Sequence, residues 1–182
     1  MNLPFSAGSL RAFLQTLRYG HNYDQPLQSV KFPGSLLTLT FGRDFNQSLQ
    51  GVSFPALLQT LTLGEVFDQP LKGVEFRASL LTLNLGREFD QPLLGVNFPA
   101  ALQTLTFGDR FDQPLQGVKF PASLQSLTFG VDFNQPLQGV DFPASLQTLT
   151  MPDEFNQAVH NLNILSNELV NLAMSYLRIV EV

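Results

Sequence analysis

The acidic and amide side chains that could bind a cation recur once every 22 residues. The column consists of Asp24, Asn46, Asp68, Asp90, Asp112, Asn134 and Asn156, and a glutamine follows each member. Aligned carboxylates at Asp68, Asp90 and Asp112 would repel one another, and a bound calcium ion would relieve that repulsion. Asparagine occupies the column equally well, however, and the glycine-rich spacing of calcium-binding β-helices is absent. We therefore predict a structural column without metal or cofactor: the short side chains accept backbone N–H groups in a turn, and the glutamines form a ladder.

The residue types of enzyme active sites are scarce in this chain. The absence of cysteine removes thiol nucleophiles and thiolate metal sites. The two histidines, His21 and His160, stand at opposite ends of the repeats and cannot share a site. No serine has a base in phase with it, and the glycines are spread over the repeats instead of forming a phosphate-binding loop. The sequence predicts a protein that is not an enzyme.

Threonine supplies a second polar feature, at two outward positions of a short strand that each repeat is expected to form. The candidate binding face comprises Thr38, Thr40, Thr60, Thr62, Thr82, Asn84, Thr104, Thr106, Ser126, Thr128, Thr148 and Thr150, preceded by Thr16 and Arg18 in the first repeat. With neighbouring strands about 4.8 Å apart, these residues would form a grid of hydroxyl and methyl groups that carries almost no charge. Three interpretations are open: strand propensity alone, a protein-binding face, or recognition of a regular surface such as ice or a polysaccharide.

The repeat at residues 124–145 shows how the chain would position these columns. Leu124, Leu127 and Phe129 alternate with polar residues, which predicts a strand with one buried face. The return that follows would bury four more apolar residues and contains proline, which disfavours a helix or a central strand. Those four are Phe133, Leu137, Val140 and Phe142. Between strand and return, pairs such as Asp109-Arg110 should lie in solvent.

A glycine ends the strand run in every repeat but the last. The glycines are Gly20, Gly42, Gly64, Gly86, Gly108 and Gly130. Because glycine tolerates positive φ, we expect the chain to turn there in that conformation.

The fixed period predicts a β-solenoid with about seven stacked 22-residue coils and one parallel sheet. Residues 1–13 are expected to form an N-terminal cap, or to be the ragged end of a longer array. The solenoid would span 14–164. Residues 165–182 carry apolar residues at three- and four-residue steps, which predicts an amphipathic helix that caps the last coil or binds a partner.

The pattern L-x-x-L-x-F-G-x-x-F-N-Q-P-L, followed by F-P-A-S-L, resembles the FNIP repeat, a 22-residue relative of the leucine-rich repeats. The resemblance covers residues 14–164, and its departures are local: Ser48 and Ala158 replace one proline, and Arg77 replaces the proline of F-P-A-S. It implies a leucine-rich-repeat-like solenoid that acts as an interaction scaffold and carries no enzymatic residues.

The amino-acid composition and charge indicate which classes of partner to expect. Charged residues make up 14% and hydrophobic residues 44% of the chain, which is typical of a folded protein. The net charge is -5 and the basic residues form no stripe, so a nucleic-acid partner is not expected. No apolar run is long enough to span a membrane, and no secretory signal is visible, so we expect a cytoplasmic protein. The prediction is a non-catalytic scaffold for an unknown protein partner. Binding to a regular surface is the alternative, and end-to-end self-association is also open.

Overall fold

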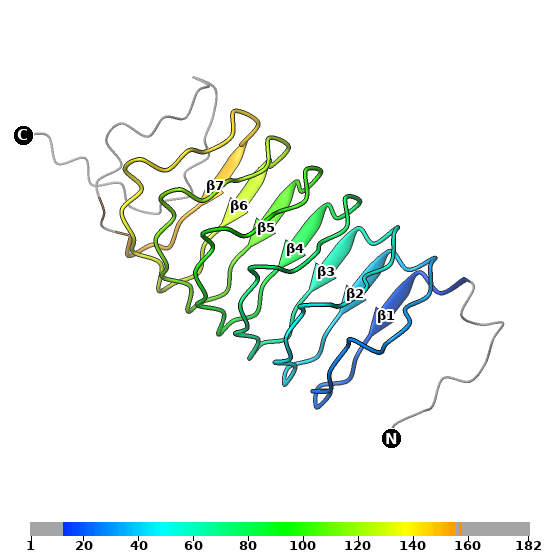
Figure 1. Cartoon of the computed structure of the whole chain (residues 1–182). Helices are drawn as coiled ribbons and strands as arrows, with labels where there is room; N and C mark the ends of the chain where they lie inside the picture. Colours follow the sequence, from blue (N-terminus) through cyan, green and yellow to red (C-terminus); the bar gives the residue numbers. More distant parts are fainter. Residues whose placement is uncertain (1–12, 156, 158–182) are drawn as a thin grey trace, which may run out of the picture.

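The computed structural model describes residues 13–155 and 157, and these form one solenoid with a single parallel sheet (Figure 1). Its strands are β1 (Thr16–Arg18), β2 (Thr38–Thr40), β3 (Thr60–Thr62), β4 (Thr82–Asn84), β5 (Thr104–Thr106), β6 (Ser126–Thr128) and β7 (Thr148–Thr150). They lie side by side in chain order. The predicted solenoid is confirmed. The predicted helix over 165–182 and nearly all of the predicted cap lie outside the described residues.

Each strand pairs with the next in a register of 22 residues. Leu39 lies opposite Leu61 and Thr38 opposite Thr60, and the same offset holds at all six strand pairs. A position of the repeat therefore becomes a straight column of equivalent residues across the solenoid.

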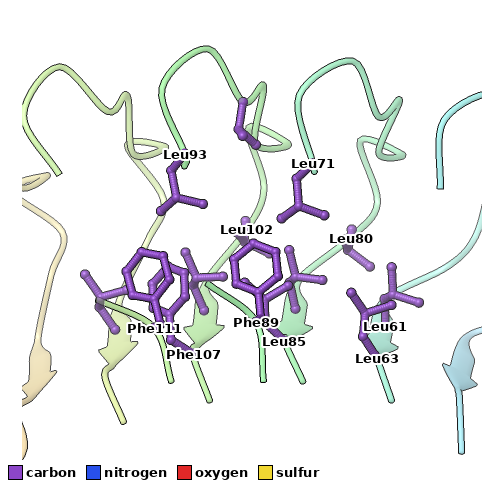
Figure 2. Close-up of a cluster of buried hydrophobic side chains, with 14 of the residues drawn as sticks. Leu61, Leu63, Leu71, Leu80, Leu85, Phe89, Leu93, Leu102, Phe107 and Phe111 are labelled. Atoms are coloured by element: carbon purple, nitrogen blue, oxygen red, sulfur yellow. The ribbon is translucent and has the colours of Figure 1, made fainter. Parts of the chain in front are cut away.

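The seven inward positions predicted for one repeat are all buried, from Leu124 at 0% exposure to Phe142 at 7%. Figure 2 shows the middle of this core, where the rings of Phe89 and Phe111 lie among leucines from neighbouring coils. The aromatic column runs through Tyr23, Phe45, Phe67, Phe89, Phe111, Phe133 and Phe155. Like residues stack on like residues, so each coil completes the core of its neighbours.

The coils lie farther apart on the return side than on the sheet side. Hydrogen-bonded strands lie about 4.8 Å apart. Just past the strands, the ring centroids of Phe107 and Phe129 are 5.3 Å apart. In the deeper column from Tyr23 to Phe155, successive centroids are 6.0–6.3 Å apart, and successive rings are inclined by 4–16°. We infer from this widening that the stack bends and that the sheet lies on its concave side.

The glycine column after the strands has a different cause from the predicted one. Positive φ occurs elsewhere in the repeat, at Gly51, Gly73, Gly95, Gly117 and Gly139. The chain does turn after the strand, as the bond from Phe89 N to Gly86 O shows. Gly86 itself does not have positive φ, however, and a Cβ there would overlap the carbonyl oxygen of Gly64 in the preceding coil. The prediction of positive φ was wrong, because glycine is required here by the close approach of two backbones.

We predict that Gly86→Ala destabilises the solenoid by about 1–3 kcal/mol or more, because backbone atoms must move to admit the methyl group. Gly34→Ala is the matched control: a Cβ there meets no atom within 4 Å, and Ala56 and Ala78 hold the same position in later repeats. The free energy of unfolding, from urea titration, is the measurement. Equal stabilities for the two variants would contradict the close-approach explanation.

Candidate functional site

The outward face of the sheet carries the predicted hydroxyl grid. In β2 to β7 the central leucine is buried and the residues on both sides of it are partly exposed. Only one hydrogen bond forms on this face among the described residues, from Asn84 Nδ2 to Thr62 Oγ1 at 3.2 Å. The other hydroxyl groups of the grid make no hydrogen bond to any residue that the structure describes. All twelve candidate residues lie on this face.

Among the described residues, one ion pair joins Lys119 to Asp141 on the return, and the other seven lie at the edge of the sheet just past the carboxyl ends of the strands. There the predicted solvent-exposed pairs form a ladder of ion pairs whose side chains are 40–63% exposed. The shortest pair joins Arg87 Nε to Asp109 Oδ2 at 2.9 Å, and this hydrogen bond raises the pKa of Arg87. The sequence showed the charges, but their pairing between coils becomes visible only when the coils are stacked.

The Asp/Asn column is a structural ladder. Oδ1 of Asp90 accepts the backbone N–H of Asp112 at 3.0 Å and the amide of Gln113 at 2.9 Å. Oδ1 of Asp68 makes the same two bonds to Asp90 and Gln91. The prediction that these side chains accept backbone N–H groups is confirmed, and the donors belong to the next coil. Asparagine fits equally well because a single oxygen accepts both bonds.

Groups with metal or acid–base potential lie apart from one another. No cluster of three or more His, Asp or Glu side chains in the described part of the chain could hold a metal ion. His21 is exposed in the turn after β1, and His160 lies outside the described residues. Burial raises the pKa of Tyr19 and Tyr23, which occupy phenylalanine positions in the first coil. No helix that could cross a membrane is found among the residues that the structure describes.

Comparisons with known proteins place this geometry among repeat proteins. The FNIP repeat model matches residues 23–66, 67–110 and 89–132. The crystal structure of CroV588, described as a novel circular LRR protein structure, is similar with a TM-score of 0.73 and 38% sequence identity. The match covers 80% of this chain and 21% of the CroV588 chain. No curated protein sequence matches.

We predict that Asp90→Ala destabilises the protein by about 1–3 kcal/mol, because two donors of the next coil lose their acceptor. Asp90→Asn should change stability much less, since its Oδ1 can accept the same two bonds and Asn46 already does so in its own coil. Urea titration of both variants tests this. Similar losses for Ala and Asn would show that the carboxylate charge matters instead.

Calcium should leave the thermal midpoint unchanged, because each carboxylate of the column is already engaged by N–H donors. The measurement is the melting temperature with millimolar CaCl₂ and with a chelator, using MgCl₂ as the ionic-strength control. A calcium-specific rise that disappears in Asp90→Asn would restore the calcium hypothesis.

Proposed function

Because the chain belongs to the FNIP repeat family, we propose that it is a non-catalytic scaffold that binds a protein partner across the concave sheet face. A cytoplasmic location is part of this proposal. The observation that carries it is the in-register grid over seven strands, in which nearly all hydroxyl groups have no hydrogen-bond partner among the described residues.

The curvature favours a protein over a flat lattice. A rounded protein surface can fill a concave face, whereas a grid that bends at every coil departs from the planar spacing of ice or a crystalline polysaccharide. CroV588 is described as circular. A circular array requires coils that bend in the same sense at every step, and the spacing of the deeper ring column stays at 6.0–6.2 Å from coil to coil.

The sheet face carries almost no charge, and this determines which groups of a partner protein can complement it. Hydroxyls that donate and accept can pair with backbone amides and polar side chains of a partner without the desolvation penalty of buried ions. The ion-pair ladder then lies at the rim, where charges influence association rate and orientation more than affinity.

The double variant Thr62→Arg and Thr106→Arg tests the proposal. Arg18 holds the same column in β1, so an arginine is compatible with the strand. We expect the variant to keep its melting temperature and to lose proteins that the wild type captures from cell extract, measured by quantitative mass spectrometry. Gln138→Arg, on an exposed return arc, is the matched control and should retain them.

Unchanged capture by the double variant would refute binding through this face. Inhibition of ice recrystallisation by the wild type, lost in the same variant, would support the alternative of a regular surface.

A further inference from the structure

The segment that leads into each strand follows the consensus F-P-A-S-L-Q, and its departures from that consensus are unevenly distributed. The entries into β6 (residues 120–125) and β7 (residues 142–147) keep it completely. The entry into β2 has Gly34 in place of alanine, and the entry into β5 departs only at Ala101, in place of serine. The other departures are large side chains in the entries into β2, β3 and β4: Leu37 and Leu81 in place of glutamine, Leu57 in place of serine and Arg77 in place of proline. We call these four residues the entry patch. In a repeat protein the shared residues maintain stacking, so exposed departures are where a specific function can reside.

The three leucines of the entry patch surround Gln59 at the amino edge of the sheet. Leu37 O accepts the backbone N–H of Gln59, and Gln59 O accepts that of Leu81, both at 2.8 Å. With strands about 4.8 Å apart, the backbones of Leu37 and Leu81 are then about 10 Å apart. Leu57 belongs to the turn closed by the bond from Leu58 N to Pro55 O, and it is 54% exposed. Leu37 and Leu81 are partly exposed.

Leu57 cannot make the hydrogen bonds that the consensus serine makes at this position in other coils. Ser79 Oγ donates to Ala56 O and Leu58 O, and Ser123 Oγ donates to Ala100 O and Leu102 O, at 2.7–2.8 Å. A leucine at this place forgoes such bonds and leaves most of its side chain in water. Packing against the described residues therefore does not account for the leucine.

Arg77 adds a positioned cation beside these leucines. Its carbonyl still closes the turn, with Leu80 N at 3.0 Å, so the proline is dispensable. Its Nε donates to Phe54 O at 2.7 Å, which holds the guanidinium against the preceding coil. Arg77 forms no ion pair with any residue that the structure describes, so its terminal nitrogens remain available to a carboxylate.

We propose that the entry patch binds a polypeptide segment that presents a leucine-like side chain next to an aspartate or glutamate. The leucines bury the apolar side chain, and Arg77 pairs with the carboxylate in the geometry that arginine favours at interfaces. This inference rests on the proposed scaffold function, and it specifies where that scaffold anchors its partner and by what chemistry.

The test uses the full chain and the quadruple variant Leu37→Gln, Leu57→Ser, Arg77→Pro and Leu81→Gln. Each new residue already occupies the same position in other coils, so we expect the melting temperature to be unchanged or higher. The probe is a library of random twelve-residue peptides. We expect the wild type to select peptides in which a large aliphatic residue adjoins an acidic one. The quadruple variant should bind them at least about tenfold more weakly. Arg77→Pro alone should remove the acidic preference and keep the aliphatic one.

Three results would overturn the inference. They are selection of no peptides, equal binding by the quadruple variant, and selected peptides without the acidic residue. A wild-type dimer that becomes a monomer in the quadruple variant would identify a second copy as the occupant and would also overturn it.

Failure of the scaffold proposal would look different. The variant Thr62→Arg with Thr106→Arg probes the whole face and should leave binding of the short peptides intact. A protein partner lost with that variant but retained by the quadruple variant would support the scaffold and refute the anchor.

Discussion

The structure depends on the close, in-register stacking of one coil on the next. Each strand has only three residues, so the sheet alone supplies few hydrogen bonds per coil. Cohesion comes also from columns of like side chains: phenylalanine on phenylalanine, leucine on leucine, and one Asp or Asn oxygen that joins two N–H groups of the next coil. At Gly86 the backbones approach so closely that no side chain fits. Every such contact requires a residue of similar kind to return after 22 positions, which is why the period has no insertion.

This constraint also limits where function can lie. Positions that face the core, close the turns or form the Asp/Asn ladder are occupied by stacking and cannot vary freely. The outward residues of the strands have no such role in stacking, and nearly all of their hydroxyl groups lack a hydrogen-bond partner among the residues that the structure describes. The residues of the entry patch can also vary, for a different reason. Leu57 and Arg77 depart from the consensus without disturbing the turn, since Leu58 N and Leu80 N still bond to the carbonyls of residues 55 and 77.

The ion-pair ladder illustrates how a local sequence feature acquires meaning from stacking. Arg87 adjoins Glu88 in sequence, and its shortest contact is to Asp109, 22 residues later. The sequence predicts only that these charged residues lie in solvent. In the stacked coils they pair with charges of neighbouring coils and form a ladder along one edge of the sheet. The side chains are largely exposed, so the ladder contributes little to stability and mainly determines the charge at the rim of the sheet.

The sequence by itself determined the fold and the location of the strands, because the strict period assigns every residue to a column and the apolar positions assign each column an inside or an outside. In the repeat at residues 124–145 all seven predicted inward positions are buried, and in β2 to β7 the residues on both sides of the central leucine are partly exposed. The tertiary structure alone decided what depends on distances between coils: the bend of the sheet, the donors that reach each Asp or Asn oxygen, and the reason for glycine at Gly86. Local propensity suggested positive φ there, whereas the actual cause is a carbonyl of the preceding coil. Spacings and contacts of this kind arise between residues 22 apart, and they exist only once the coils are packed.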